Sequence, residues 1–177
     1  MGAMTTDRDT EFRIFMAAVW PRLLRTAYLL AGDQHAAEDL AQSAFERAYA
    51  AWGRVSRADD PLAYVRRILV NQHARSHRRR PPELLVTAVP ESAIPEDGFA
   101  RSDQRSALLS ALAALPPRQR TAVVLRHWED LSDSQAAAAM GCSVGAVRSQ
   151  AAKGIARLRE VAQLKELQEV GRVGGAV

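Results

Sequence analysis

Residues 131–150 constrain the fold most, because they have the pattern of two helices separated by a tight turn. Ser132, followed three residues later by Gln135, predicts a capping box at the start of the first helix. Gly141 can adopt a positive φ and end that helix, and Ser143 can cap the second helix. We therefore expect a helix-turn-helix in this part of the chain.

The second helix of this unit is predicted to extend to about residue 160, with two different faces. Its apolar face consists of Val144, Val147, Ala151, Ile155 and Leu158. The opposite face carries Gly145, Arg148, Ser149 and Ala152. Small and basic residues at the exposed start of a second helix suit insertion into the major groove of DNA.

Positive charge is concentrated in one segment far upstream of the helix-turn-helix. The chain has a formal net charge of +4 at pH 7. Residues 61–82 contain no acidic residue and six arginines, namely Arg66, Arg67, Arg75, Arg78, Arg79 and Arg80. Such a run favours a polyanionic partner such as nucleic acid, although charge alone is equally consistent with a solvated helix end.

Several kinds of site are not expected from this sequence. The single cysteine, Cys142, excludes an internal disulfide and a cysteine-based zinc site. His73 and His77 have the i, i+4 spacing that suits a metal, but no Glu lies between them as in the zinc-protease motif. With no Gly-rich phosphate loop and no nucleophile–base pattern, we predict no catalytic residue, no metal and no cofactor. The sequence also shows no signal peptide and no apolar run approaching about 18 residues, which predicts a cytoplasmic protein without a membrane partner.

The expected fold class is all-α, with two small helical domains joined by a flexible linker. Helical spacing of apolar residues predicts a first domain over residues 10–80, in which Pro21 bends a helix or marks a junction. Gly32 and Asp33 are expected to stop the first helix and cap the second. The second helix is expected to bury one apolar stripe, made of Ala37, Leu40, Ala41, Ala44, Phe45, Ala48 and Trp52. Gly53 is expected to end it, and Pro61 to begin the third helix.

Residues 81–103 hold prolines and acidic residues with little periodicity and are expected to form the linker. The second domain is expected over residues 104–165, with a helix over 118–128 before the helix-turn-helix.

Four segments, in this order, resemble motifs of bacterial sigma factors of the extracytoplasmic-function group, which is group IV of the sigma-70 family. Residues 37–45, AEDLAQSAF, are similar to the family's core-polymerase motif, and residues 61–71, PLAYVRRILVN, to its promoter-melting helix. Residues 115–120, LPPRQR, resemble the start of the family's fourth domain, and residues 141–149, GCSVGAVRS, its recognition helix. The resemblance covers about residues 11–160.

This resemblance implies a promoter-specificity subunit that binds core RNA polymerase through the β′ clamp helices and the β flap. Such a subunit recognises the −10 and −35 promoter elements and promotes transcription initiation, and it is not an enzyme. Promoter DNA is therefore an expected partner. An anti-sigma factor is another, because family members are often held inactive by one.

The resemblance also assigns roles to individual residues. Binding to the basic β′ clamp helices falls to Glu38, Asp39 and Gln42, which share one helical face. Recognition of the −10 element falls to the loop over residues 54–60 and to Tyr64, Arg67, Asn71 and Arg75, with Arg78 and Arg79 on phosphates. Recognition of the −35 element falls to Arg118, Gly145, Arg148, Ser149 and Lys153, of which Arg148 and Ser149 are expected to reach base edges. Tyr64 stands where the family usually has Trp, and Gln135-Ala136 where it usually has Glu-Ile.

Other interpretations of the same residues remain open at this point. Glu38, Asp39 and Gln42 would also suit a solvated acidic face, and Tyr64 would suit ordinary core packing. An autonomous helix-turn-helix regulator is the alternative function, with the first domain used for dimerisation or sensing. Such a regulator has no need for an exposed acidic face or for a second basic helix, and a protein–protein adaptor would not explain the arginine run.

Overall fold

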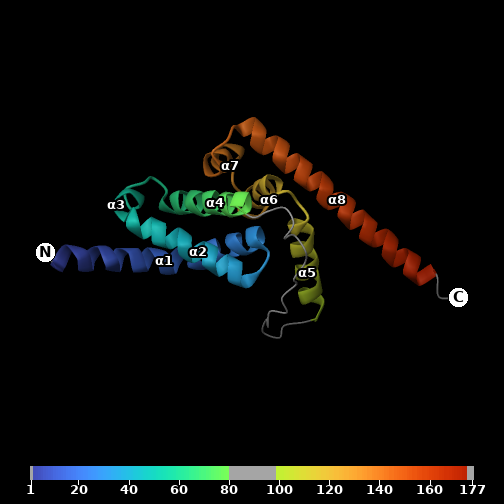
Figure 1. The fold of residues 1–177 in the computed structure, drawn as a ribbon, viewed down its shortest axis with the longest axis horizontal. Helices are drawn as coiled ribbons and strands as arrows, with labels where there is room; N and C mark the ends of the chain where they lie inside the picture. The colour runs from blue at the N-terminus through green and yellow to red at the C-terminus, as the bar shows by residue number, and fades with distance from the viewer. Residues whose placement is uncertain (1, 80–98, 175–177) are drawn as a thin grey trace.

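The computed structural model describes residues 2–79 and 99–174, and in these ranges the chain consists of helices joined by short connections (Figure 1). This confirms the all-α class predicted from the sequence. The helices are α1 (Gly2–Ala31), α2 (Gln34–Ala50), α3 (Trp52–Val55), α4 (Pro61–Arg79), α5 (Phe99–Ala113), α6 (Pro117–Val123), the π-helical segment η2 (Val124–Trp128), α7 (Asp133–Met140) and α8 (Val144–Gly174).

Helices α1, α2 and α4 form the body of the first domain, with α2 packed against both of the others. The turn between α1 and α2 follows the predicted chemistry. Gly32 has a φ of +89°, and the Asp33 side chain accepts a hydrogen bond of 2.8 Å from the Ala36 amide. These two residues end one helix and cap the next, so the apolar sides of α1 and α2 face each other.

Small and aromatic residues fill the space between these helices. Ala37, Ala41, Ala44 and Ala48 on α2 are fully buried, so the backbones of α1 and α2 can approach closely. At one end the Phe12 ring meets the Trp52 ring edge to face, at 5.2 Å between centroids. The apolar face predicted for α2 is therefore the buried one.

The interior of α1 explains a feature of its composition. Its segment Asp7–Ala31 is long and apolar enough to cross a membrane by those two criteria. In the structure, Leu23, Ala27 and Leu30 of this segment are buried in the protein core. A long core helix can give the same signal as a membrane span, and here 28% of the apolar window is buried, so packing accounts for part of its apolar residues.

In the first domain, the junction alternative for Pro21 and the predicted end of the second helix are wrong. Pro21 marks no junction, because α1 continues through it. The carbonyl that Pro21 leaves without an intrahelical donor belongs to Ala17, and both residues are exposed, so water can satisfy it. Gly53 does not end α2, which stops at Ala50. The chain turns there so that Trp52 can be buried, and Gly53 lies inside the short helix α3.

The second domain starts earlier than expected and contains an irregular turn. Helix α5 begins at Phe99, within the segment predicted as linker, whose residues 81–98 lie outside the described residues. The helix expected over residues 118–128 is α6 followed by η2, where the Glu129 amide donates to the Val124 carbonyl at 3.0 Å. After this wider turn Trp128 is exposed and Glu129 is buried.

The two domains are packed against each other. Helix α4 contacts α6 and α7, and helix α1 contacts α5, α6 and η2. In Figure 1, α7 and α6 lie beside α4, while α8 extends away toward the C-terminus. Helix α4, which was expected to melt the promoter, therefore packs against the other helices of the first domain on one side and against the second domain on another.

Candidate nucleic-acid interface

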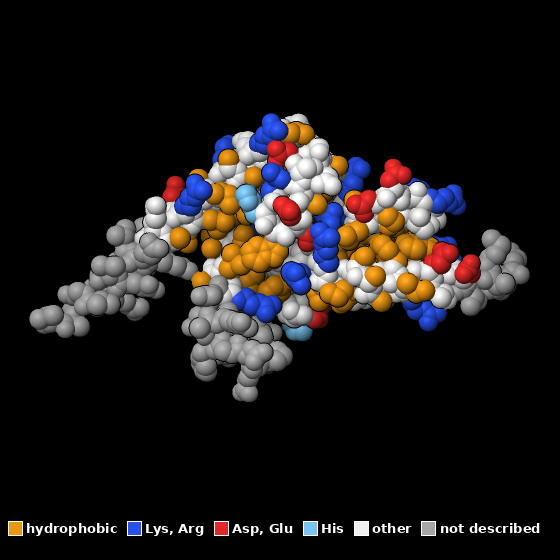
Figure 2. All heavy atoms as spheres, turned by 180° about the vertical axis from the view of Figure 1, so that it is seen from behind, with side chains coloured by type: hydrophobic (Ala, Val, Ile, Leu, Met, Phe, Trp, Pro, Cys, Tyr) orange, Lys and Arg blue, Asp and Glu red, His pale blue; other side chains and the backbone are white. Residues whose placement is uncertain are grey.

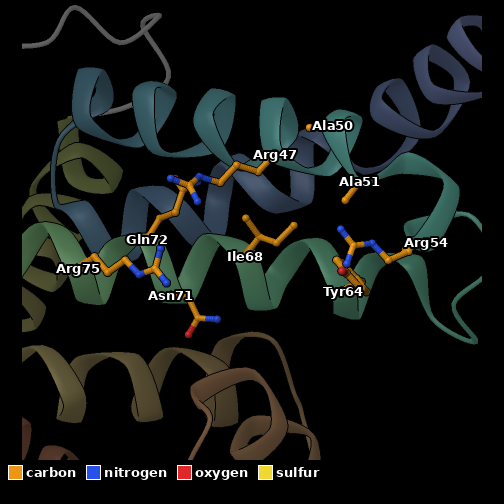
Figure 3. A pocket seen from close by; sticks show the side chains of 9 residues that line it. All are labelled: Arg47, Ala50, Ala51, Arg54, Tyr64, Ile68, Asn71, Gln72 and Arg75. Atoms are coloured by element: carbon orange, nitrogen blue, oxygen red, sulfur yellow. The ribbon is translucent and has the colours of Figure 1, made fainter.

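An open groove of about 350 Å³ runs between α2 and α4, and Figure 3 shows the side chains around it. We call it the α2–α4 groove. It is lined by Arg47, Ala50, Ala51, Arg54, Tyr64, Ile68, Asn71, Gln72 and Arg75. Its wall therefore combines three guanidinium groups with an aromatic ring and two amides.

This combination suits a single nucleic-acid strand. Guanidinium groups can hold phosphates, an aromatic ring can stack on an unpaired base, and an amide such as that of Asn71 can pair with a base edge. The groove is held open by contacts of its own, because Gln72 donates from Nε2 to the Ser43 carbonyl at 3.1 Å and so ties α4 to α2. The site is preformed in the free chain.

Of the residues expected at the −10 element, Tyr64, Asn71 and Arg75 line this groove. Arg54 lines it too, from the short helix α3, although residues 54–60 were expected to form a loop. Arg67 is exposed on α4 but does not line the groove. The side chains of Arg78 and Arg79 lie outside the part of the chain that the structure describes.

Two residues of the groove were not expected from the sequence, Arg47 and Gln72. Arg47 lies on α2, in the helix assigned to polymerase binding. Its place in the groove depends on how α2 and α4 pair, which sequence periodicity does not specify. The only feature of the sequence that could have drawn attention to Arg47 is that it is a lone basic residue on an otherwise acidic exposed face.

The acidic residues of α2 form an exposed surface, with their helix held by its buried alanines. Asp39 and Gln42 are exposed and Glu38 is half-buried. Gln42 donates from Nε2 to Glu46 Oε1 at 3.2 Å, which adds Glu46 to this face. None of the ion pairs seen among the described residues involves these three carboxylates, so their charge is available to a basic partner.

The helix-turn-helix has the predicted capping. The Gln135 amide donates to Ser132 Oγ at 3.2 Å, and the Ser132 amide donates to Gln135 Oε1 at 2.8 Å. Gly141 has a φ of +62°, and Ser143 Oγ accepts from the Ala146 amide at 3.2 Å. Gln135 therefore completes the capping box in the place of the usual Glu, and the small Ala136 beside it is fully buried.

The expected recognition face of α8 points to solvent. Gly145, Arg148, Ser149 and Lys153 are exposed, whereas Val147 and Ala151 are buried against the domain. A Cβ at Gly145 would meet no described atom within 4 Å. Packing within the protein therefore does not require a glycine there.

Arg148 is held by an acidic neighbour. Its Nε donates to Asp133 Oδ2 at 2.7 Å, and Asp133 Oδ1 lies 2.6 Å from Arg126 Nε. The hydrogen bond from Arg148 is the main reason why the pKa of Asp133 lies below its ordinary value. The bond to Asp133 uses Nε of Arg148. The two terminal nitrogens, which would contact a guanine, are not used in this bond.

Arg126 also donates to the Leu131 carbonyl.

Arg118 lies apart from the other −35 residues. It is exposed on α6 and lines a cavity of about 620 Å³ between the domains. The cavity is lined by Val70, Asn71, His73, Ala74, Arg75 and His77 from α4, and by Pro116, Pro117, Arg118, Thr121, Met140 and Gln150 from the second domain. The structure thus places Arg118 opposite α4, with Gln150 at the start of α8 across the same space.

The histidines of α4 do not make a metal site in the described residues. Their rings meet edge to face at 4.5 Å between centroids, and no third His, Cys, Asp or Glu joins them there. His73 is buried, and burial, followed by His77 and Arg120, lowers the pKa of its imidazole from 6.5 to about 3. It is a neutral packing residue at neutral pH.

The basic residues of the groove do not extend over the whole surface. Figure 2 shows the face seen from behind Figure 1, where basic side chains alternate with acidic ones around a broad apolar patch. A nucleic acid would find no continuous basic surface on that face. This argues against nonspecific binding along that face.

Two family models match this chain. The model described as Sigma-70 region 2 matches residues 15–81, and the one described as Sigma-70, region 4, matches residues 105–158. The first match contains the α2–α4 groove and the acidic face of α2, and the second contains the helix-turn-helix.

Several named relatives are similar over most of their length. The RNA polymerase sigma-E factor of Streptomyces coelicolor is 37% identical over 158 residues, which cover 89% of each chain. The protein of the same name from Streptomyces antibioticus is 36% identical over 93% of this chain and 91% of its own. The solved sigma factor RpoE from Bartonella quintana, in complex with the anti-sigma factor NepR, is 25% identical with a TM-score of 0.71, covering 86% of this chain and 97% of RpoE.

Proposed function

The chain belongs to the sigma-70 family of RNA polymerase sigma factors, in the extracytoplasmic-function group, and from this premise we propose which surface serves each step of initiation. Sigma factors are regulatory subunits of RNA polymerase and not catalysts themselves. This one directs the core enzyme to promoters by joining a polymerase-binding surface to two DNA-binding surfaces. The observation that carries the proposal is the α2–α4 groove, because it gathers cationic, aromatic and amide side chains beside an exposed acidic face.

The first domain, residues 10–80, binds the polymerase and melts the promoter. Asp39, with Glu38 and Gln42, binds the basic β′ clamp helices by charge complementarity. Support comes from the exposure of Asp39 and from the lack of a described ion pair that would neutralise it. Tyr64, Asn71 and Arg75 take an unstacked base and the backbone of the −10 strand into the α2–α4 groove.

The second domain, residues 104–165, reads the −35 element and contacts the β flap. Arg148 and Ser149 reach base edges, Gly145 lets the DNA approach the helix, and Lys153 contacts a phosphate. Support comes from the exposure of all four residues on one side of α8. We place Arg118 on phosphate only after the two domains separate, because it faces α4 in this structure.

The remaining roles follow from the family. We propose that the protein acts in the cytoplasm, where RNA polymerase and promoter DNA are found, and that residues 81–103 join its domains. We propose an anti-sigma factor as a further partner, since the solved relative RpoE is in complex with one. No metal or cofactor is needed for any of these roles.

The affinity for purified core RNA polymerase tests the proposal, with wild type measured against Asp39→Arg. We expect tight binding by the wild type and its loss in Asp39→Arg, because the reversed charge would face a basic surface. Glu160→Arg is the matched control, since Glu160 is exposed on α8, far from the acidic face. Circular dichroism would confirm that each variant is folded.

The alternative function predicts different results. A folded wild-type protein that does not bind core polymerase but binds duplex DNA tightly on its own would be an autonomous regulator. An unchanged core affinity in Asp39→Arg would show that the polymerase interface has been placed on the wrong helix face.

A further inference from the structure

The start of α8 has an acidic residue beside its basic one, on a surface that we assign to DNA. Arg148 donates from Nε to Asp133 Oδ2 at 2.7 Å, across 15 residues of chain. Asp133 is the first residue of α7. A carboxylate at this place repels the phosphates of DNA and neutralises part of the charge of Arg148. Attraction to DNA alone therefore does not account for Asp133.

Asp133 is held from its other side by a second arginine. Its Oδ1 lies 2.6 Å from Nε of Arg126, which belongs to the π-helical segment η2. Arg126 also donates to the Leu131 carbonyl, in the connection between η2 and α7. The Asp133 and Arg126 side chains are 23% and 30% exposed, against 69% for Arg148. The exposed arginine is thus tied to a carboxylate that the domain itself holds in place.

The backbone at Asp133 is fixed separately from its side chain. The capping box between Ser132 and Gln135 closes around it, with hydrogen bonds of 3.2 and 2.8 Å. A carboxylate in the first turn also suits the positive end of the helix dipole. Because the capping box does not use the Asp133 side chain, a substitution there should leave the start of α7 intact.

The bond to Nε determines which part of the Arg148 guanidinium can face DNA. The guanidinium is planar and rigid, so fixing Nε fixes the direction of its two terminal nitrogens as well. Those nitrogens can pair with O6 and N7 of a guanine. An arginine without such a neighbour can also turn to a phosphate, which carries no sequence information. Asp133 therefore favours one orientation of the donor pair over the alternatives.

The electrostatics of the cluster agree with this arrangement. The pKa of Asp133 lies below its ordinary value, and the hydrogen bond from Arg148 is the largest cause. Burial opposes the shift, while the charges of Arg126 and Arg148 add to it. Asp133 is therefore ionised at neutral pH. Two arginines against one carboxylate still attract DNA, but less strongly than two arginines alone.

We propose that Asp133 is a specificity-determining residue of the −35 interface, which holds Arg148 in the orientation that reads a guanine. It is a positioning residue, since Arg148 makes the base contact. The inference rests on the proposed −35 recognition and deepens it. Its consequence is that Asp133 lowers the affinity for DNA of any sequence and raises the discrimination between sequences.

The test uses holoenzyme reconstituted from core polymerase and the full chain. The probe is a promoter fragment selected from genomic DNA, with its −35 segment randomised, and sequencing identifies the bound fragments. Arg148→Ala first locates the base pair that Arg148 reads, as the position at which the preference for guanine is lost. We expect the wild type to prefer guanine there about tenfold or more.

Asp133→Asn should lower this preference about fivefold and leave the preferences at other positions unchanged. An amide has only one oxygen, so it can accept from one of the two arginines and not from both. Asp130→Asn is the matched control. It removes the same charge from an exposed residue outside the cluster, and Asn tolerates its φ of +53°. It should keep the wild-type preference.

A double variant separates positioning from a structural role. In the Arg148→Ala background, Asp133→Asn should change the base preference no further, because the residue that it positions is absent. Binding to a duplex of unrelated sequence should become about twofold tighter in Asp133→Asn. A folded Asp133→Asn that keeps the guanine preference, or that loses preference equally at all positions, would overturn the proposal.

An NMR titration tests the contact without changing Asp133, in case Asp133→Asn fails to fold. The ¹³C shift of the Asp133 carboxyl group gives its pKa in the wild type and in Arg148→Gln, which alters an exposed side chain. The pKa should rise toward its ordinary value in Arg148→Gln. Equal values in the two proteins would show that Asp133 does not hold Arg148.

The same experiments distinguish this inference from the proposed function. A chain that does not bind core polymerase, or a wild-type holoenzyme that enriches no −35 sequence, would refute the proposed function and the inference with it. A guanine preference that depends on Arg148 and not on Asp133 would refute the inference alone.

Discussion

The two sides of helix α4 differ sharply although both carry basic and polar residues. On the side toward α2, Tyr64 and Ile68 line an open groove, and Asn71 and Arg75 line both this groove and the cavity between the domains. On the side toward the second domain, Arg66 and His73 are buried, at 5% and 3% exposure. The first side is available to a ligand and the second is used to hold the molecule together. What decides the role of an arginine here is the element packed against it, not its position in a basic run.

The buried side also changes the electrostatics of its residues. Burial lowers the pKa of Arg66, while Glu129 opposes this shift by favouring the charged guanidinium. His73 has no acidic partner among the groups that shift its pKa, which are His77 and Arg120, and it stays neutral. On helix α4, Arg66 is thus a buried cation that is paired with an acid, whereas His73 is buried in its neutral form.

The strongest contrast should be in stability, between the neighbours Arg66 and Arg67. Arg66→Ala leaves Glu129 buried with one partner fewer, and we expect it to lower the free energy of unfolding by about 3–5 kcal/mol. Arg67→Ala removes an exposed side chain and should change it by less than about 0.5 kcal/mol. Urea titration followed by circular dichroism measures both. Equal effects would mean that the buried ion pair contributes nothing to holding the fold.

Helix α8 should show the same contrast, because substitution of a buried glycine and of an exposed glycine should change stability in opposite directions. A Cβ at Gly154 would lie 2.6 Å from Val123 Cγ2, so Gly154→Ala should cost about 1–3 kcal/mol by overpacking α8 against α6. Gly145→Ala meets open space and should stabilise the helix by up to about 1 kcal/mol. Thermal unfolding distinguishes them. Gly145→Ala should nevertheless weaken transcription from −35-dependent promoters, and normal transcription would remove Gly145 from the proposed interface.

The open side of α4 should affect DNA and not the fold. Tyr64→Ala removes the ring in the groove, and loss of one stacked base is worth about 1–3 kcal/mol of binding free energy. We expect promoter opening by the reconstituted holoenzyme to fall on the order of tenfold, measured by permanganate reactivity of unpaired thymines. Tyr64→Phe should retain most of the activity. Full activity in Tyr64→Ala would show that Tyr64 does not bind promoter DNA and serves only in packing.

The smallest effect should come from the titration of His73. Its pKa is 6.5 when unfolded and about 3 in the folded protein, so between these values only the unfolded chain binds the proton. Stability from this group is therefore complete above pH 6.5 and is lost as the pH falls. At pH 5.5 the loss should be about 1.4 kcal/mol relative to pH 8. The slope should be absent in His73→Gln. A slope that persists there would assign it to other groups.

Local features of this chain were largely predictable from the sequence. The capping box at Ser132, the turns at Gly32 and Gly141 and the apolar stripe of α2 involve residues close together in sequence, so spacing and turn chemistry were enough to find them. Tyr64 and Asn71 were expected at the −10 site because a family motif covers them, and Arg75 because it follows on the same helix; all three line one groove.

Contacts between distant segments were not predictable. Arg66 lies in a run of arginines that looked like a DNA surface, yet its partner Glu129 is 63 residues away. Arg120 binds a carbonyl 90 residues away, and Arg47 enters the groove only because α2 pairs with α4. Periodicity along one helix assigns its faces, but it does not say which element packs on each face. The π-helical segment η2, which buries Glu129 in place of Trp128, also has no simple sequence signal.

The most direct test of the assignment of the α2–α4 groove to promoter DNA is photo-cross-linking in the holoenzyme. The photoreactive residue p-benzoylphenylalanine would replace Tyr64, in the groove, or Tyr28, which lies under the guanidinium of Arg105 at 4.9 Å. Each holoenzyme would be bound to promoter fragments selected from the genomic DNA of the encoding bacterium. We predict cross-links from position 64 to the non-template strand of the −10 element, and none from position 28. Cross-links to that strand from position 28, with none from position 64, would contradict the assignment of the α2–α4 groove to promoter DNA.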